Sequence, residues 1–122
     1  MDNTLDLLLK SSVSNPPEKD YKVKRLSTEC GGDVIFRLRA LSFSRVAEVR
    51  AVDSDEISVH IIMAGVISPD LKKPELQAKY GALTPADLVK AMLLPGEIDD
   101  LALRIEQLSG YKKTVVEEVK KK

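Results

Sequence analysis

Prolines and glycines divide the second half of the chain into short helices, and this spacing limits the fold more than any other feature of the sequence. Proline is favoured at the first position of a helix, and glycine just after the last one, because glycine readily adopts positive φ angles. Pro74 and Gly81 bound a first helix, Pro85 begins a second that Pro95 stops, and Gly110 ends a third. We therefore predict three successive helices joined by very short connections.

Capping residues and apolar spacing support this division. Thr84 is placed to cap the second helix, with Asp87 at its third position, which is close to a capping box. Gly96 and Glu97 begin the third helix. Its apolar residues recur at helical spacing and form one stripe, at positions 98, 101, 102, 105 and 108.

The first 19 residues predict a short helix followed by a linker. Residues 5–13 have a helical apolar period, with Asn3 or Thr4 available as the N-cap. The two prolines of "SNPPEKD" then stop the helix. The run "LDLLL" resembles a short helical docking motif, but leucines on a helix more often belong to a core, and we expect that here.

Residues 20–41 predict a β-hairpin. The runs "DYKVKRLS" and "DVIFRLRAL" have a period of two, which places alternate side chains on opposite faces of a strand. Between them, "TECGG" supplies two glycines for a slightly long hairpin loop. Because an isolated hairpin is marginal in water, its apolar face is expected to pack against helices.

A further helix of two to three turns is predicted after the hairpin. Ser42 is placed to cap it, and Phe43, Val46, Ala47 and Arg50 would share one face.

Residues 56–66 fit both a strand and a helix. Acidic residues at the start favour a helix through the macrodipole, with three candidate caps, Asp53, Ser54 and Asp55. Gly65 and Pro69 would mark its end. These segments form the predicted helical region, residues 42–110.

Length and composition limit the class of protein. A chain of 122 residues suits a single domain, here 1–122, with residues 111–122 as a tail that is either a frayed helix or disordered. A single cysteine cannot form an internal disulfide. Because the chain shows no secretory signal and no run near the roughly 20 apolar residues that span a bilayer, we expect a cytoplasmic protein without a membrane partner.

Charge is balanced overall but unevenly placed. Residues 21–50 carry seven basic and three acidic residues, whereas residues 51–109 carry five and ten. Basic side chains would line one polar face of the hairpin, namely Lys22, Lys24, Arg25, Arg37 and Arg39. That face supports an alternative function, a small regulatory or nucleic-acid-associated protein, although a duplex binder normally has a larger basic excess.

No catalytic constellation stands out. His60 is the one histidine of the sequence and lies within an apolar run, and Cys30 has no neighbour in sequence that would activate its thiol. Adjacent carboxylates such as Asp99 and Asp100 diverge by about 100° on a helix and do not converge on a substrate. We therefore predict no catalytic residue, no metal site and no cofactor, and a binding protein rather than an enzyme.

The last two predicted helices carry more apolar residues than one stripe requires. Such a surplus indicates a partner groove, self-association or a thick shared core. The candidate partner-binding residues are Leu88, Met92, Leu93, Leu94, Leu101, Leu103, Ile105 and Leu108.

Several short motifs recur in an order that resembles a known family. They are "GVISPDLK" (65–72), "YGALTPADL" (80–88), "LLPGEI" (93–98) and "LSG" (108–110). Together with "GGDVIFRLRALSF" they make residues 20–111 similar to the XkdN-like tail assembly chaperones of phages and prophages of Gram-positive bacteria.

This resemblance implies a non-enzymatic protein that acts in tail assembly. Its partner would be the long tape measure protein, which it keeps soluble, and it would help recruit the tail tube protein. It would act in the host bacterial cytoplasm and be absent from the mature virion. The expected fold is α+β, mainly α, with an N-terminal helix and linker (1–19), one β-hairpin (20–41) and four or five packed helices.

Overall fold

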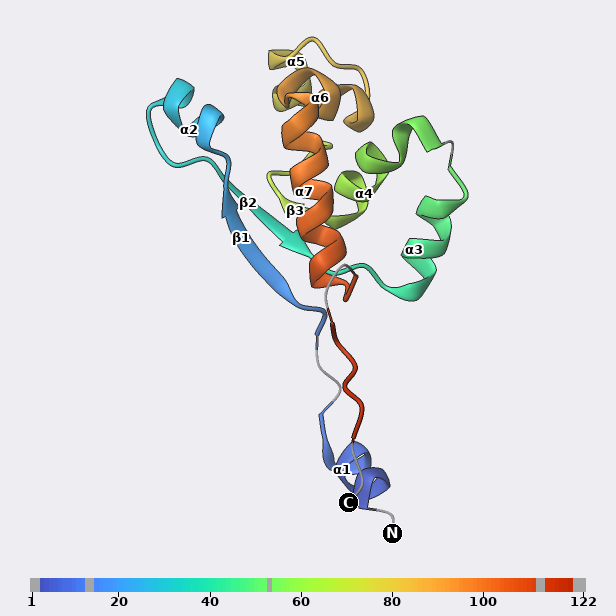
Figure 1. Cartoon of the computed structure of the whole chain (residues 1–122). Coiled ribbons are helices and arrows are strands. Elements are labelled where there is room, and N and C mark those ends of the chain that lie inside the picture. The colour runs from blue at the N-terminus through green and yellow to red at the C-terminus, as the bar shows by residue number, and fades with distance from the viewer. Residues whose placement is uncertain (1–2, 13–14, 53, 112–113, 120–122) are drawn as a thin grey trace.

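The structure, a computed structural model, describes residues 3–12, 15–52, 54–111 and 114–119. In these residues a three-stranded antiparallel sheet has helices packed on one face, so the fold is α+β and mainly α, as predicted (Figure 1). The strand order is β1-β2-β3, with β1 (Glu18–Lys22), β2 (Ile35–Arg39) and β3 (Val66–Ser68).

The helices follow the order expected from the sequence, with one addition. They are α1 (Asn3–Lys10), α2 (Lys24–Cys30), α3 (Phe43–Arg50), α4 (Ile57–Gly65), α5 (Pro74–Lys79), α6 (Pro85–Met92) and α7 (Pro95–Leu108), and a 3₁₀ turn, Ser54–Glu56, precedes α4. In the described part of the chain, no helix is both long enough and apolar enough to cross a membrane.

The predicted alternation in the second hairpin strand is confirmed. Phe36 and Leu38 of β2 are fully buried, while their neighbours along the strand point outward. β1 pairs with β2 in an antiparallel register that sets Tyr21 opposite Phe36. Because α7 packs on this side of β2, the apolar face of the hairpin is covered by a helix, as expected.

The first predicted strand is wrong beyond Val23, because the next residues form α2. Ser27 accounts for this: its hydroxyl donates to the Val23 carbonyl and accepts from the Val34 N–H, both at 2.8 Å. These bonds link the first turn of α2 to the chain entering β2. Gly31, at φ 73°, ends this helix, whereas it was predicted to lie in a slightly long loop that joins the two strands directly.

Residues 57–65 form a helix, which was the preferred interpretation. The helix ends at Gly65, and the chain then continues directly into a strand. Val66–Ser68 form β3, a third strand that the sequence analysis missed, and pair with β2. Of the predicted caps, Asp53 lies outside the described residues. Glu56 occupies the N-cap position, without a side-chain hydrogen bond to the helix.

The divisions in the second half are confirmed. Thr84 Oγ1 accepts a hydrogen bond from the Asp87 N–H at 3.1 Å. Gly81 and Gly110 have φ angles of +67° and +96°, which glycine adopts without strain. The third of these helices begins at Pro95, slightly earlier than predicted.

Helix α3 begins as predicted but faces a different way. The Ser42 hydroxyl accepts from the Arg45 N–H at 3.2 Å, which confirms the cap. Phe43, expected inside, is 89% exposed, and Ala47 is also exposed. Only one narrow side of α3 touches α4, and Val49 is the residue that it buries.

Helix α1 contradicts the expectation that its leucines join the core. None of its residues is buried, and Figure 1 shows it beyond the end of the sheet, apart from the other helices. Of the predicted helix over 5–13, Val13 lies outside the described residues. Residues 114–119 of the tail are exposed and form neither helix nor strand, while 112–113 and 120–122 lie outside the described residues.

The core is organised by α7, which packs most extensively against α4 and also contacts α6 and β2. Its predicted stripe is confirmed: Ile98, Leu101, Ala102 and Ile105 are buried, and Leu108 is half-buried. At the closest approach, a Cβ placed on Gly65 would lie 2.6 to 2.9 Å from three side-chain atoms of Ile105. Only glycine therefore fits at the end of α4.

We predict that Gly65→Ala destabilises the protein by about 1–3 kcal/mol, because Ile105 is fully buried and cannot move aside freely. Urea unfolding followed by circular dichroism measures the change. Gly96→Ala is the matched control: nothing lies within 4 Å of the added Cβ, and a helical alanine should be neutral or stabilising by up to about 1 kcal/mol. Equal stability of the two variants would show that α4 and α7 are less tightly packed than described.

Candidate partner-binding surfaces

Most of the predicted partner-binding residues lie inside the core. Five of the eight are buried, namely Leu88, Met92, Leu93, Leu101 and Ile105. These side chains hold α6 and α7 to each other and to α4. They are therefore not available to a partner while the helices stay packed. Their burial corresponds to the thick shared core that was one of the alternatives above.

The other three predicted residues are accessible to different degrees. Leu94, between α6 and α7, is 52% exposed. Leu103 is half-buried on α7, and Leu108 is half-buried and packs against the core.

Several large apolar side chains outside the predicted set are exposed, and the sequence did not identify them as surface residues. Leu83, which precedes α6, and Phe43 are each 89% exposed, and the four leucines of α1 are 52–73% exposed. The run "LDLLL" was a usable signal, because an eight-residue helix with leucines on several sides buries all of them only if something surrounds it.

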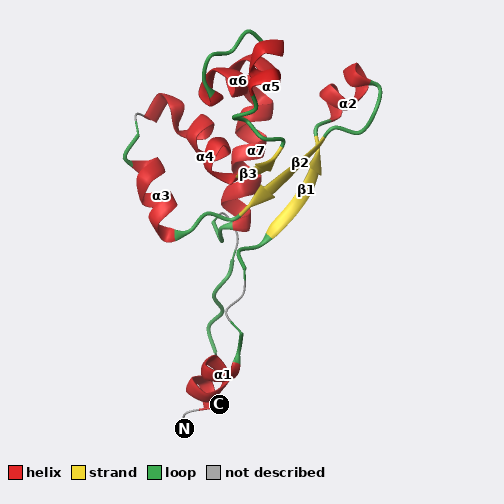
Figure 2. Ribbon diagram, turned by 180° about the vertical axis from the view of Figure 1, so that it is seen from behind, coloured by secondary structure: helices red, strands yellow, loops and turns green. Residues whose placement is uncertain are grey.

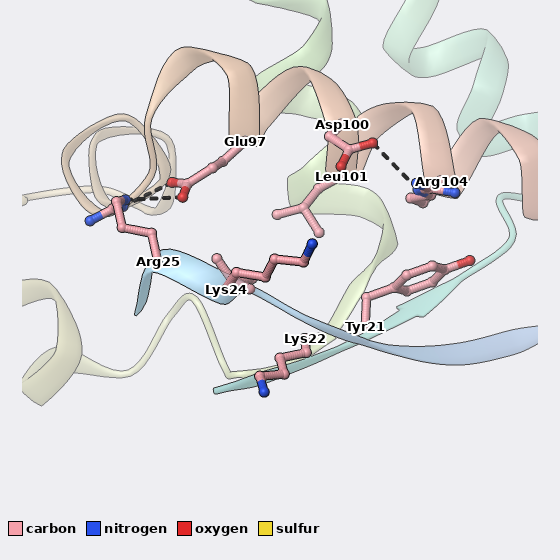
Figure 3. Close-up of a pocket in the computed structure, with 9 residues that line it drawn as sticks. Tyr21, Lys22, Lys24, Arg25, Glu97, Asp100, Leu101 and Arg104 are labelled. Atoms are coloured by element: carbon pink, nitrogen blue, oxygen red, sulfur yellow. Dashed lines mark hydrogen bonds and ion pairs between the residues drawn. The ribbon is translucent and has the colours of Figure 1, made fainter. Parts of the chain in front are cut away.

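A cleft of about 470 Å³ separates the β1–α2 segment from α7 (Figure 3). The Lys24 side chain extends across it toward Leu101. On the far wall, Arg104 Nε lies 3.4 Å from Asp100 Oδ1, and the Arg104 guanidinium lies 5.8 Å from the centre of the Tyr21 ring. The cleft is thus lined mainly by charged side chains, and Tyr21, Val23 and Leu101 are its apolar members.

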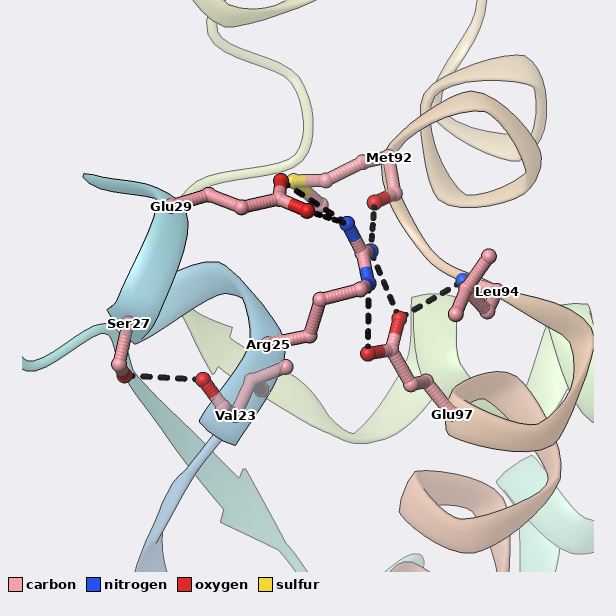
Figure 4. Close-up of polar contacts among 7 residues, drawn as sticks. All are labelled: Val23, Arg25, Ser27, Glu29, Met92, Leu94 and Glu97. Atoms are coloured by element: carbon pink, nitrogen blue, oxygen red, sulfur yellow. Dashed lines mark hydrogen bonds and ion pairs between the residues drawn. The ribbon is translucent and has the colours of Figure 1, made fainter.

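Arg25 of α2 lines one end of this cleft (Figure 3), and its polar contacts are drawn in Figure 4. Its Nε and Nη2 donate to the two Glu97 carboxylate oxygens at 3.0 and 2.8 Å, Nη2 also donates to the Met92 carbonyl at 3.0 Å, and Nη1 donates to Glu29. Glu97 Oε1 in turn accepts the Leu94 N–H at 2.7 Å. Arg25 therefore joins α2 to the α6–α7 connection.

This network alters the titration of Glu97. Hydrogen bonds from Arg25 lower the pKa of the Glu97 carboxyl below its usual value, with a further contribution from the Leu94 N–H, because both stabilise the charged form. Desolvation of the carboxylate opposes the shift but is the weaker effect.

The predicted basic face of the hairpin holds only in part: the register places Lys22, Arg37 and Arg39 on the exposed face of the β1–β2 pair, whereas Lys24 and Arg25 belong to α2. Arg25 belongs to α2 and faces α7, Lys22 pairs with Asp33 at 3.2 Å, and Arg37 pairs with Glu18 and Asp20 at 2.8 and 2.9 Å. The hydrogen bonds to Glu18 and Asp20 raise the pKa of Arg37. These pairs consume much of the charge that a phosphate backbone would need.

The two side chains considered for catalysis, His60 and Cys30, lie in separate parts of the fold. His60 is half-buried on α4, and Cys30 is exposed at the end of α2. Among the described residues, no three His, Cys, Asp or Glu side chains gather as a metal site would require.

Comparison with known proteins identifies the family. A profile described as "Phage XkdN-like tail assembly chaperone protein, TAC" matches residues 44–121, which is well over half of the chain. The chain belongs to this family. The resemblance found in the sequence is thereby confirmed, and the family is one of tail assembly chaperones.

A solved structure supports the fold. The crystal structure of the protein YqbN, a structural genomics target, is similar, with a TM-score of 0.69 and 20% sequence identity, covering 87% of this chain and 95% of that chain. At this identity, the similarity shows a shared fold alone. No match was found among curated proteins.

We predict that Glu97 contributes to stability in a pH-dependent way. Because its folded pKa is below the unfolded value near 4.5, the contribution is complete above that pH and is lost as the pH falls through the folded pKa. Chemical unfolding from pH 7 to pH 3 should show Glu97→Gln less stable than wild type at pH 7, with the difference shrinking in acid. Glu117→Gln, in the exposed tail, is the control, and a constant difference for Glu97→Gln would contradict the assignment.

Proposed function

We propose that this chaperone binds the tape measure protein of the phage tail, keeps it soluble, and assists assembly of the tail tube around it. Membership of the tail assembly chaperone family supports a phage tail protein as the partner. In this proposal the chain acts in the host bacterial cytoplasm, by binding and not by catalysis, and does not remain in the mature virion.

The observation that carries the proposal is exposed apolar surface beside a complete core. Leu83 lies just before α6 and Leu94 just after it, and they are 89% and 52% exposed although α6 itself buries Leu88, Val89 and Met92. Both residues lie in the short connections that flank α6, and exposed apolar side chains on a packed body support a partner-binding surface there. Leu103 on α7 is the other member of the predicted set outside the packed core.

This arrangement suits a chaperone for a long helical protein. The buried stripe of α7 and the caps of α6 fix the geometry of the helix ends, so a partner meets a preformed surface and loses little free energy in ordering it. Apolar contacts at α6 would cover apolar segments of the tape measure protein and keep it from aggregating.

We predict that the double substitution Leu83→Ser with Leu94→Ser weakens binding to the tape measure protein by at least about tenfold, because two apolar anchors are lost. Co-expression of the two proteins, followed by measurement of tape measure protein in the soluble fraction, gives the readout. Wild type should hold the tape measure protein in solution, and the variant should return most of it to the pellet.

The matched control is Val116→Ser with Val119→Ser, which removes two apolar residues that are 82% and 86% exposed in the tail. It should behave as wild type. If wild-type chaperone at equal expression leaves the tape measure protein insoluble, the proposed function is wrong. If both double variants fail equally, the α6 surface is not the binding site.

A further inference from the structure

The cleft between the β1–α2 segment and α7 contains one charge that the chain does not pair. Lys24 is exposed, and its side chain extends across the cleft toward Leu101 (Figure 3). The other basic side chains of the lining are paired within the chain: Lys22 with Asp33, Arg25 with Glu97, and Arg104 with Asp100. Among the described residues, Lys24 is therefore the unpaired ion of this cleft.

Lys24 is not needed to form or to hold α2. It is the first residue of that helix, where the macrodipole disfavours a positive charge, and no acidic residue lies in the first turn to offset it. The bonds that tie α2 to the body come from Arg25 instead. The Lys24 ammonium group is thus free to meet a group from outside the chain.

The cleft is open and continuous with the surface proposed above. In both views α2 stands at the end of the β1–β2 pair, apart from the helical layer (Figures 1 and 2). At one end of the cleft, Glu97 accepts the N–H of Leu94, which is one of the two exposed leucines beside α6. A segment bound at Leu94 can therefore continue along α7 into the cleft.

The charges of the lining indicate what such a segment carries. Four basic and two acidic side chains line the cleft, so an acidic ligand is favoured. Tyr21 and Leu101 beside Lys24 add apolar contacts. A nucleic-acid backbone fits less well, because three of the four basic side chains are already paired and a phosphate chain has no apolar group for the rest of the lining.

We propose that this cleft binds a segment of the tape measure protein in which a carboxylate lies beside an apolar side chain. The carboxylate pairs with the Lys24 ammonium group, and the apolar side chain packs on Tyr21 and Leu101. In a helical segment the two side chains would be three or four residues apart, on one face. This inference rests on the proposed function and adds to it a charge requirement on the partner.

Fluorescence anisotropy tests the inference with labelled 20-residue peptides that tile the tape measure sequence, titrated with the full chain up to about 1 mM. Wild type should bind peptides that combine acidic and apolar residues, and Lys24→Glu should bind them at least about tenfold more weakly. Lys24→Arg, which keeps the charge, should bind nearly as wild type. Lys79→Glu makes the same change of charge at an exposed site on α5 and is the matched control.

A charge exchange distinguishes a direct contact from an indirect effect. In a peptide that binds, replacing the acidic residue by lysine should weaken binding to wild type and restore binding to Lys24→Glu. The variant should fold, because glutamate is favourable in the first turn of a helix. Circular dichroism checks this point.

The results separate this inference from the function on which it rests. If wild type keeps the whole tape measure protein soluble but Lys24→Glu binds the peptides equally well, or the charge exchange restores nothing, the cleft assignment is wrong and the function stands. The same holds if no peptide binds, or if a 20-nucleotide single strand binds in place of the peptides. If wild type leaves the tape measure protein insoluble, the function is wrong and the inference falls with it.

Discussion

The contact between α7 and α4 is the constraint on which the rest of the structure depends. At Gly65 the two helices approach so closely that Ile105 occupies the space of a missing Cβ. This position is also where α4 ends and β3 begins, so the same glycine sets the spacing of the helices and the entry into the sheet. Because β2 also packs against α7, the sheet and the helical layer share one core.

At the edge of the fold, hydrogen bonds from Arg25 fix the position of α2. Helix α2 buries only Leu26 and Ser27, which is little apolar area to fix its position. The bidentate bond to Glu97 and the bond to the Met92 carbonyl tie it to the α6–α7 connection with defined geometry. Charge-assisted bidentate bonds of this kind are stronger and more directional than neutral ones. Polar contacts thus complete an arrangement that apolar burial leaves underdetermined.

The division between buried and exposed apolar residues bears directly on function. The leucines of α6 and α7 are largely consumed by the core, whereas those at the ends of α6 and along α1 are exposed. The exposed leucines are therefore the apolar side chains of these elements that a partner can reach without unpacking the helices.

The sequence by itself determined the local elements of this protein. Thr84, Pro85 and Gly110 act through their own backbone and nearest neighbours, so their caps were predictable, and so was the buried face of β2, because strand alternation is local. The order of short motifs also identified the family.

Tertiary structure decided the rest. Residues 24–27 were predicted as the end of a strand, but they begin α2, and the bond from the Val34 N–H to the Ser27 hydroxyl forms only when the chain entering β2 lies beside this helix. Likewise, β3 is a strand only because β2 lies beside it. Leu88 and Ile105 were proposed as binding residues because helical spacing alone does not say which apolar face another helix will cover. Those choices depend on residues distant in the sequence, since burial is a property of the packed whole.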